Sequence, residues 1–401
     1  MTLFLKTIPV SEARQIAGQL SCPMPEELVS LEESYSRVLA RDIHADVDIP
    51  GFDRSVMDGY AVRSSDTAGA GEAIPAMLQL VGSVTMGGKA DFSIGRGECA
   101  YVPTGAELPQ GADAVAMVEY CDLLGDQVLV KKPMANGENM VRKGEDFSSG
   151  ELVLNEGRRL SIQDVGALAA VGKNVVPVRK KPLIGIISTG NELIPVDAVP
   201  SGGQVRDVNS YMCRSFLDSI CCDSRLFGIV RDDRESLGDA LKTAMNECDG
   251  VLISGGSSKD ERDMCADLIR ENGEVLVHGI ALAPGKPTII GRLGEIPVLG
   301  LPGHPASALV VMTVIGRPLF RGMTGERESD RLVEKAILAK NIPSTKGRED
   351  YIRVMIKDGY AHPLFGKSGL LNTLVRSDAI IRVPAGSEGL EAGDEVEVLR
   401  W

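Results

Sequence analysis

The sequence is poor in several side chains on which much enzyme chemistry depends. Its 401 residues include four histidines, one tryptophan and eight cysteines. The cysteines form no C-x-x-C pair, and none stands at a spacing from histidine that is typical of a zinc site. We therefore expect reduced, mostly buried thiols in a cytosolic protein. The chemistry must then depend mainly on carboxylates, lysines, hydroxyls and backbone groups.

Long hydrophobic runs and an excess of positive charge are also missing. No apolar run approaches the roughly 18 residues of a membrane-spanning helix, and residues 1–11 lack the cleavage pattern of a signal peptide. Lys and Arg number 43 against 56 Asp and Glu, which gives a formal net charge of −13 at pH 7. Nucleic acids and anionic membranes attract positively charged proteins, so we expect neither as a partner. Small anionic ligands would need local basic groups or backbone amides.

The composition is that of a globular protein, with 43% hydrophobic and 25% charged residues. At about 150 residues per domain, the chain should form two to four domains. Residues 8–40 are expected to be helical in character, with Ser11 as an N-cap and with a break at Pro23 and Pro25 after the stretch Glu12–Leu20. A β-rich texture follows, and helical character returns at Ser161–Val171, where Ser161 and Asp164 suit a capping box. We predict a helical N-terminal domain of residues 1–46 and 148–180, interrupted by a β-rich inserted domain of residues 47–147.

Residues 181–327 alternate apolar strands with helices. The expected strands are Leu183–Ile187, Val251–Ile253 and Ile296–Leu301, and the expected helices are one capped by Asp233 and one over Asp263–Glu271. Fully apolar strands between helices indicate a doubly wound parallel sheet, hence an α/β domain. After residue 327 the texture is β-rich again, which predicts a C-terminal β-barrel or sandwich over 328–401; we take it as a barrel. The predicted fold class is therefore multidomain α+β and α/β.

Three strands of the α/β segment end in loops of small residues. These loops are Ser188-Thr189-Gly190-Asn191-Glu192, Ser254-Gly255-Gly256-Ser257-Ser258 and Pro302-Gly303-His304-Pro305-Ala306-Ser307. Ligands of open α/β sheets bind beyond the carboxyl ends of the strands, and small residues let backbone amides approach an anion. A single loop of this kind is usually only a tight turn. Three in one sheet predict a site for phosphate or a similar group.

Acidic residues stand on or near the same loops. Asp233 is explained as a helix cap, but Glu192 and Asp263 follow phosphate-type loops directly, and Asp232 lies close by. Bare carboxylates would repel a phosphate, whereas a bridging Mg²⁺ binds both. Lys286, in Pro284-Gly285-Lys286-Pro287, could supply positive charge, although a solvated turn lysine is equally consistent with its position.

The β-rich segment contains a second unusual stretch, Pro50–Val62. It is dense in polar and aromatic residues without hydrophobic alternation, which favours a functional loop, while Asp58-Gly59 alone suits a turn. Pro103–Ala106 and Arg142–Asp146 also suit turns, and the residues alone give them no role.

Together these motifs resemble the molybdopterin molybdenumtransferase family, the MoeA type and the E domain of gephyrin. The resemblance covers residues 7–400, in order, through Phe52–Ala61, Thr104–Ala106, Ser188–Leu193, Arg206–Asn209, Gly255-Gly256, Pro284–Pro287 and Leu301–Gly303. It implies a four-part subunit and a homodimer with an active site between the α/β domain of one subunit and the β-rich module of the other. It also implies the insertion of molybdate into the dithiolene of adenylylated molybdopterin, with release of AMP and dependence on Mg²⁺. An adenylyltransferase and cofactor-accepting enzymes are implied as further partners.

The resemblance also implies roles for particular residues. The functional acids of the family fall on Asp58, Glu192, Asp232 and Asp263, and the β-rich side adds Thr104, Arg142 and Asp146. We assign Glu192, Asp232 and Asp263 to the metal, and Arg142 and Lys286 to molybdate or phosphate. The residues expected to bind the pterin substrate are Ser188, Thr189, Gly190, Asn191, Asn209, Ser254, Gly255, Gly256, Ser257, Ser258, Pro284, Gly285, Pro302, Gly303, His304, Ser307 and Ser368.

The chain departs from the family pattern at a few positions. Ser257 and Lys259-Asp260 stand where valine and Val-Gly are usual, Ala283 where a lysine is frequent, and His304 where asparagine is usual. These changes leave alternatives open: a tungstate-preferring insertase, the adenylyltransferase step, or a scaffold that binds the cofactor without turnover. The presence of all four acids argues against a pure binding protein.

Overall fold

The computed structural model describes residues 7–255, 259–327 and 334–401. The chain divides into two compact units, each described by itself below. Unit 1 comprises Met1–Ala40, Gly157–Leu160 and Val176–Trp401, and unit 2 comprises Arg41–Glu156 and Ser161–Val175. The four domain boundaries predicted above stay a prediction, because a division into two units does not test them.

A six-stranded sheet in the order β16-β13-β17-β21-β20-β18 forms the centre of unit 1. Its strands are β13 (Leu183–Thr189), β16 (Asp223–Val230), β17 (Gly250–Gly255), β18 (Glu274–His278), β20 (Ile289–Leu293) and β21 (Ile296–Leu301). The first four strands in the order are parallel, which confirms the doubly wound sheet. The last two are antiparallel, a feature that the sequence reading missed. Gly294, at φ 59°, allows the tight hairpin that reverses the chain between β20 and β21.

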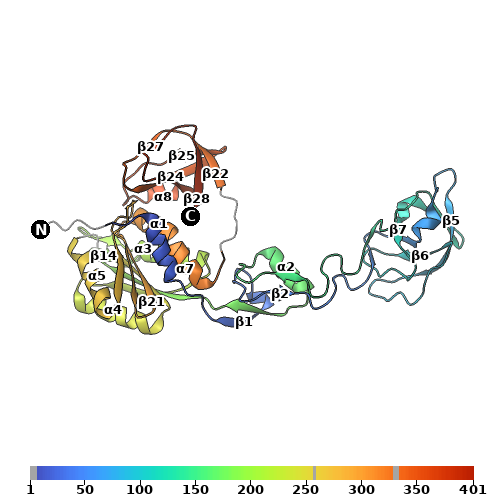
Figure 1. Cartoon of the computed structure of the whole chain (residues 1–401), viewed down its shortest axis with the longest axis horizontal. Helices are drawn as coiled ribbons and strands as arrows, with labels where there is room; N and C mark the ends of the chain where they lie inside the picture. Colours follow the sequence, from blue (N-terminus) through green and yellow to red (C-terminus); the bar gives the residue numbers. More distant parts are fainter. Residues whose placement is uncertain (1–6, 256–258, 328–333) are drawn as a thin grey trace. The chain divides into compact units, whose positions relative to one another are not determined.

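Helices cover both faces of this sheet (Figure 1). They are α1 (Val10–Gln19), α3 (Asn209–Ser219), α4 (Arg234–Glu247), α5 (Lys259–Asn272), α6 (Pro305–Val311) and α7 (Arg317–Thr324). Because side chains alternate along a strand, Ile186 contributes to the core beneath α1, α3, α6 and α7, whereas Ile187 contributes to the core beneath α4 and α5. Asp233 caps α4 by accepting a hydrogen bond from the Ser236 N–H, as predicted.

The helical run Pro305–Thr324 corrects one expectation. It joins α6 and α7 through a π-helical turn (Met312–Gly316), and its length and mean hydropathy of 1.2 satisfy the simple test for a membrane span. However, 72% of that window is buried inside unit 1, where Val311, Ile315 and Phe320 belong to the core. The run is therefore explained as the core helix of the α/β domain.

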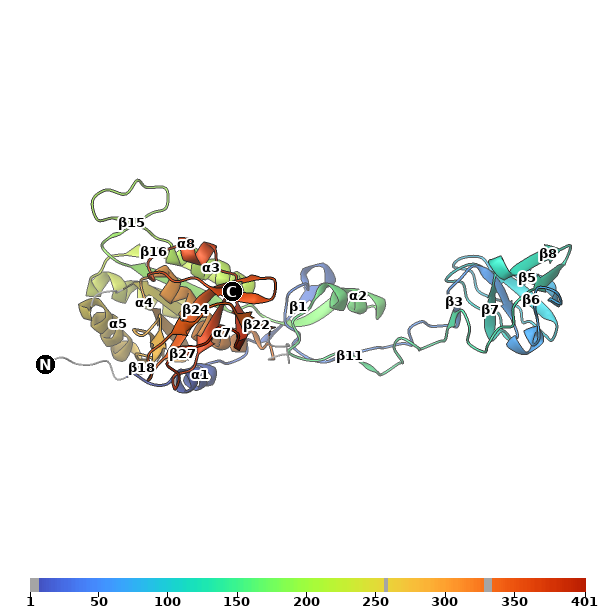
Figure 2. The ribbon, with the colours of Figure 1, turned by 90° about the horizontal axis from the view of Figure 1, so that it is seen from above.

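The C-terminal part of unit 1 is a closed five-stranded barrel, as predicted. Its strands are β22 (Glu334–Leu338), β24 (Glu349–Lys357), β25 (Tyr360–Pro363), β26 (Ala379–Val383) and β28 (Glu395–Arg400). Pairing between β24 and β26 closes the ring around a core that includes Val354, Ile381 and Val396. Four short elements belong to the same region as the barrel: β19 (Leu282–Ala283), β23 (Ile342–Pro343), β27 (Gly389–Leu390) and α8 (Asn372–Val375). Of these, β27 and α8 are labelled in Figure 2.

The N-terminal segment forms the predicted helix before the break at Pro23 and Pro25, but the residues after the break differ from the helical character predicted up to residue 40. Helix α1 begins after the N-cap Pro9, so Ser11 lies inside the helix and is not its cap. The helix ends before Pro23, and the chain continues as strand β1 (Glu26–Ser30), which pairs with β12 (Val175–Arg179), and one 3₁₀ turn (Leu31–Glu33). The two prolines stop the helix, and a strand partner some 150 residues away supplies hydrogen bonds that no local pattern could indicate.

Unit 2 contains a six-stranded sheet in the order β7-β4-β6-β5-β9-β8. Its strands are β4 (Gly59–Val62), β5 (Ala76–Ser83), β6 (Glu98–Val102), β7 (Ala114–Met117), β8 (Cys121–Leu124) and β9 (Gln127–Val130). Unit 2 also contains two short antiparallel pairs and one helix: β2 (Ile43–His44) with β11 (Leu152–Leu154), β3 (Arg54–Ser55) with β10 (Met140–Val141), and α2 (Ile162–Ala170). The capping box of Ser161 and Asp164 at the start of α2 is present, as predicted.

Candidate active site

A cavity of about 700 Å³ opens beyond the C-terminal ends of β13, β17 and β21. Seven residues of the predicted site line it: Thr189, Glu192, Asn209, Ser254, Gly255, Gly303 and His304. They meet because the carboxyl ends of adjacent parallel strands lie at one edge of the sheet. The chain between β14 (Leu193–Ile194) and β15 (Val205–Arg206) stands out beside this edge as a loop (Figure 2). We call this space the first cavity.

Two glycines let the loops of the first cavity approach one another. Gly255 has a φ of 146°, and a Cβ at this position would lie 1.9 Å from the carbonyl oxygen of Thr189. Gly190 has a φ of 154°, and its Cβ would lie 2.8 Å from Oε2 of Glu192. At Gly255 any other residue would force the backbone of neighbouring strands apart, whereas at Gly190 an added carbon would displace the Glu192 side chain of the same loop. The close approach also leaves backbone amides accessible to a ligand at the sheet edge.

Asn209 connects two of the loops and presents a free acceptor. Its Nδ2 donates to Ser254 Oγ at 2.9 Å and to the Gly303 carbonyl at 2.8 Å. The residue is only 6% exposed, and its Oδ1 has no hydrogen-bond partner among the described residues. A buried acceptor without a donor is energetically costly, so a donor from a bound ligand or water is expected there.

Other predicted residues support the cavity from behind. Ser188 Oγ lies 2.7 Å from Ser210 Oγ, and both side chains are buried, so Ser188 fixes helix α3 and does not line the cavity. Thr189 Oγ1 donates to Asp232 Oδ1 at 2.5 Å, and the Asp232 N–H donates to Asn191 Oδ1 at 3.5 Å. These contacts join the loop after β13 to the loop after β16. Pro302 and Ser307 are buried at the start of α6.

Carboxylates for a divalent cation come from three neighbouring strand ends. Glu192 follows β13 and Asp232 follows β16, while Asp263 lies in the first turns of α5, after β17. Carboxylate oxygens are the donor set that Mg²⁺ prefers, so residues of this type are suited to the ion. Among the side chains that the structure describes, no three His, Cys, Asp or Glu form a metal cluster. The side chain of Asp263 is outside that set, so the three-carboxylate site stays a prediction.

A second cavity of about 290 Å³ lies at the barrel, lined by Pro284, Arg348, Arg353, Ser368 and their neighbours. Arg353, on β24, is only 7% exposed, and its Nη2 donates to the Gly366 carbonyl at 2.7 Å. Its Nε has no partner among the described atoms, and burial lowers the pKa of the guanidinium. An arginine that is buried with an unused donor is suited to an anion. The sequence analysis did not single out Arg353, because an arginine in an alternating strand is expected to face solvent.

The remaining predicted residues of unit 1 are placed as follows. Lys286 is exposed and makes no side-chain hydrogen bond or ion pair with any residue that the structure describes. The Gly285 carbonyl accepts a hydrogen bond from Thr288 Oγ1 at 2.6 Å, which fixes the Pro-Gly-Lys-Pro turn. Gly256, Ser257 and Ser258 lie outside the described residues, so their predicted contacts with the substrate stay predictions.

The predicted residues of unit 2 form hydrogen-bonded pairs within that unit. Asp58 Oδ1 accepts from the Thr104 N–H at 2.7 Å and from Thr104 Oγ1 at 2.9 Å. These two donors, the backbone N–H first, lower the pKa of the Asp58 carboxyl. Arg142 Nη2 donates to Asn136 Oδ1 at 2.5 Å, which orients the guanidinium. Asp146 is exposed, and its backbone N–H donates to the Ile49 carbonyl.

Comparison with known proteins covers almost the whole chain. Residues 8–172 match the MoeA N-terminal region (domains I and II), residues 185–322 match the "Probable molybdopterin binding domain", and residues 335–401 match the MoeA C-terminal region (domain IV). The chain belongs to the MoeA family. The matched residues 185–322 include the ends of the strands β13, β17 and β21 and most of the residues that line the first cavity.

Individual MoeA-family relatives support this membership over their full lengths. A molybdopterin biosynthesis protein of Methanocaldococcus jannaschii is 36% identical over 99% of both chains. The molybdopterin molybdenumtransferase of Bacillus subtilis is 30% identical over 98% of this chain and 94% of its own. The crystal structure of the molybdopterin biosynthesis MoeA protein of Pyrococcus horikoshii has a TM-score of 0.87, with 34% identity over 99% of this chain and 100% of that chain.

Proposed function

We propose that this protein is a molybdopterin molybdenumtransferase of molybdenum cofactor biosynthesis. In the proposed reaction, the two dithiolene sulfurs of adenylylated molybdopterin replace two oxygens of molybdate, which leave as water. A further water molecule cleaves the phosphoanhydride so that AMP leaves. The observation that carries the proposal is a cavity at the ends of three parallel strands, joined through His304 and Ser368 to a smaller cavity with a buried arginine. The names and full-length similarity of the relatives support the same reaction.

The first cavity is proposed to hold the pterin and its phosphate. Its volume of about 700 Å³ lies in the range of small-molecule sites. The backbone amides next to Gly190 and Gly255 would donate to phosphate oxygens, because these loops end strands and carry no Cβ that would block approach. Asn209 Oδ1 would accept a hydrogen bond from an N–H of the pterin, which satisfies the buried acceptor.

The second cavity is proposed to hold the oxyanion. Molybdate and tungstate are tetrahedral dianions, and the unused Nε of Arg353 and the hydroxyl of Ser368 are donors of the kind that bind such oxygens. Arg348 is already paired, through its Nε at 2.9 Å from Asp350 Oδ1, so it contributes less charge to the cavity than Arg353 does.

Glu192, Asp232 and Asp263 are proposed to hold Mg²⁺. When bound, the ion would neutralise phosphate oxygens and so allow an anionic substrate to approach these carboxylates. Thr189 would keep Asp232 in place through its hydroxyl hydrogen bond. A chain of net charge −13 needs such local compensation, so we expect the pterin phosphate to bind poorly without the cation.

We further propose a cytoplasmic homodimer in which Asp58, Thr104, Arg142 and Asp146 of one subunit complete the site of the other. The support is the family resemblance of these residues, the exposed setting of Asp58 and Asp146, and a structure that keeps the cysteines as thiols. Mixing two inactive variants, Asp58→Asn and Glu192→Gln, tests the arrangement. If the site is shared between subunits, subunit exchange produces mixed dimers in which one of the two sites is intact. The mixture should then recover about a quarter of the wild-type activity, and no recovery would contradict a shared site.

One assay separates the candidate functions. Adenylylated molybdopterin is supplied with Mg²⁺ and with molybdate, with tungstate or with neither, and AMP is measured. AMP release that requires the oxyanion supports insertion, and the better oxyanion identifies a molybdate or a tungstate enzyme. Consumption of ATP with free molybdopterin would instead indicate an adenylyltransferase. Tight pterin binding without either reaction would indicate a scaffold.

Two arginine variants locate the oxyanion. Arg353→Gln should raise the molybdate concentration for half-maximal AMP release by at least about tenfold, since a charged hydrogen bond is lost. Arg376→Gln removes an exposed arginine from the same barrel domain and should change nothing. Equal effects of the two substitutions would contradict the assignment of the second cavity.

A further inference from the structure

A third cavity lies in unit 1, and neither the proposed reaction nor the family resemblance uses it. Its volume is about 400 Å³, and it is formed by α1, the helical run through α7, and the barrel strands β24 and β28. It shares no lining residue with the first cavity and only Tyr351 with the second. It is therefore a separate space whose chemistry can be considered on its own.

Positive charge is concentrated around this third cavity. Among the described residues, three arginines line it, Arg14, Arg317 and Arg321, and Glu326 is the one acid. The formal balance of this described lining is +2, in a chain of −13. Arg317 and Arg321 stand four residues apart on the same helical run, which places both on one face. A local reversal of the overall charge of this size indicates an anionic ligand.

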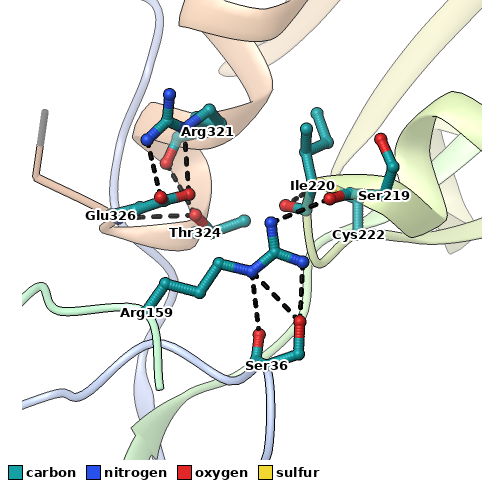
Figure 3. Close-up of polar contacts among 8 residues, drawn as sticks. All are labelled: Ser36, Arg159, Ser219, Ile220, Cys222, Arg321, Thr324 and Glu326. Carbon is teal, nitrogen blue, oxygen red and sulfur yellow. Dashed lines mark hydrogen bonds and ion pairs between the residues drawn. The ribbon is translucent and has the colours of Figure 1, made fainter. Parts of the chain in front are cut away.

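The three guanidinium groups differ in how they are held. Arg321 forms a bidentate pair with Glu326, with Nε and Nη2 at 2.9 and 2.6 Å from the carboxylate oxygens (Figure 3). Arg317 lies over the ring of Phe216, 5.3 Å from its centroid, and its Nη1 donates to the Arg400 carbonyl. These contacts fix the two side chains at the wall of the cavity.

Arg14 is the cation without a fixed partner. Within the described parts of the chain its side chain has no hydrogen bond or ion pair, and it is exposed on α1. Ala13 and Ala17 of the same helix are fully buried, so the helix that carries Arg14 is fixed firmly against the core. Tyr351 also stands in the lining, with its hydroxyl donating to Glu349 Oε2 at 2.8 Å. Burial and the charge of Glu349 raise the pKa of Tyr351, and the charges of Arg382 and Arg14 offset this in part.

The remaining lining is mostly apolar, with Thr313 and the Tyr351 hydroxyl as its polar groups, and it suits an organic body. Val314, Pro318 and Leu399 contribute aliphatic surface, and the ring of Tyr351 adds an aromatic face. A volume of 400 Å³ is far larger than an inorganic anion needs. A phosphate monoester carries a charge of about −1.5 to −2 at pH 7, which matches the balance of +2 around the cavity.

We propose that the third cavity is a binding site for the phosphate monoester of a small organic molecule. The phosphate would lie between Arg14 and Arg317, and the organic body would lie against Val314, Pro318, Leu399 and Tyr351. Arg guanidinium groups bind phosphate oxygens through paired N–H donors. A ligand in the third cavity would contact α1, the core helix and the barrel at once. It would therefore bind at a site distinct from both proposed substrate cavities.

The single tryptophan of the chain provides a probe of this site. Trp401 follows Arg400, whose carbonyl is bound by Arg317, and its ring packs partly against the same core. The experiment titrates the full-length protein with phenyl phosphate, and in parallel with inorganic phosphate and with phenol, while the Trp401 fluorescence is recorded. We expect saturable binding of phenyl phosphate at least about tenfold tighter than either part alone. Equal affinity for phenol, or for inorganic phosphate, would overturn the proposed ligand class.

Three variants assign the binding to the third cavity. Arg14→Gln should weaken phenyl phosphate binding about tenfold while leaving the thermal transition unchanged, because the side chain has no partner to lose. Arg214→Gln, an exposed arginine on another helix of the same unit, should bind as wild type. Arg353→Gln should also bind as wild type. Unchanged binding in Arg14→Gln, or lost binding in Arg353→Gln, would overturn the proposal. No molybdate or pterin is present, so the result is independent of the proposed transferase activity.

Discussion

Nδ1 of His304 lies 3.1 Å from Oγ of Ser368, and the two side chains line different cavities. A second contact, from the Ala306 N–H to the Ser368 carbonyl at 3.1 Å, fixes the same loop to the start of α6. The hydrogen bond between the two side chains therefore spans the boundary between the proposed pterin cavity and the proposed oxyanion cavity. The family resemblance predicts asparagine at the position of His304, so this link depends on a departure from that predicted pattern.

The link between His304 and Ser368 should be measurable as a coupling. His304→Leu and Ser368→Ala should each lower the rate of molybdate-dependent AMP release about fivefold, the value of one neutral hydrogen bond. The double variant should be no slower than the worse single variant, since both substitutions remove the same contact. His304→Asn should retain most of the activity. Multiplying effects in the double variant would show that the two residues act separately.

Thr189 should act by positioning Asp232. Thr189→Val keeps the shape of the side chain but removes the hydroxyl that donates to the carboxylate at 2.5 Å. We expect the Mg²⁺ concentration for half-maximal activity to rise at least about tenfold, because a charged hydrogen bond is lost. Thr189→Ser should restore the wild-type value. A loss of activity with unchanged Mg²⁺ dependence would contradict a role in holding the metal ligand.

Gly255 should tolerate no side chain. In Gly255→Ala the added carbon would meet the Thr189 carbonyl at 1.9 Å, at a φ that other residues rarely adopt. We expect a loss of at least about 3 kcal/mol in the free energy of unfolding of unit 1, followed by Trp401 fluorescence. Gly18→Ala is the matched control, because Gly18 lies in α1 with no atom within 4 Å of an added carbon. That variant should gain about 0.5–1 kcal/mol.

The carboxyl of Asp58 should titrate below its ordinary pKa of 3.8. The Thr104 N–H and hydroxyl stabilise the ionised form, so this group stabilises the folded protein above pH 3.8, and the contribution is lost as the pH falls through the lower folded pKa. Thr104→Val removes only the hydroxyl, so the pKa should rise part of the way back. A ¹³C NMR titration of the carboxyl measures this. A pKa that stays unchanged in the variant would contradict the hydrogen bond.

The cysteines should differ sharply in reactivity. Burial raises the pKa of Cys99 and Cys213 to about 12 and that of Cys121 to about 11, so these thiols stay protonated at pH 8. Cys22 is the exposed cysteine. We expect iodoacetamide at pH 8 to add one group to the native chain, at Cys22, and eight groups to the chain unfolded in urea, as read by mass spectrometry. Rapid labelling of Cys121 in the native protein would contradict the predicted burial.

Local patterns predicted those parts of the fold that local interactions determine. The apolar strands β13, β17 and β21, the cap at Asp233 and the capping box at Ser161 each depend on residues within a few positions. The strand β1 depends instead on a partner far along the chain, and its own residues did not reveal it. The antiparallel edge of the main sheet does have a local signal, because Gly294 stands in the turn between β20 and β21.

The candidate site was predictable to a similar degree. The loops after three strands meet in one cavity because parallel topology requires it, so the motif residues Thr189, Ser254 and Gly303 could be assigned from the sequence. The burial of Arg353 could not be predicted from the sequence, because it depends on the closure of the barrel around β24. Ser188 was expected at the ligand, but its hydroxyl contacts Ser210, since a strand directs successive side chains to opposite faces.

The antiparallel pair of β2 and β11, with Leu152 opposite His44 and Leu154 opposite Ile43, brings the two ends of the inserted segment side by side. A single genetic event could therefore lengthen, exchange or delete that segment without moving the residues on either side of it. The first cavity and the loop that carries Asp58 can therefore change independently of each other in evolution. Lineages of this family can be expected to diverge in the inserted module while the sheet that carries the first cavity stays the same.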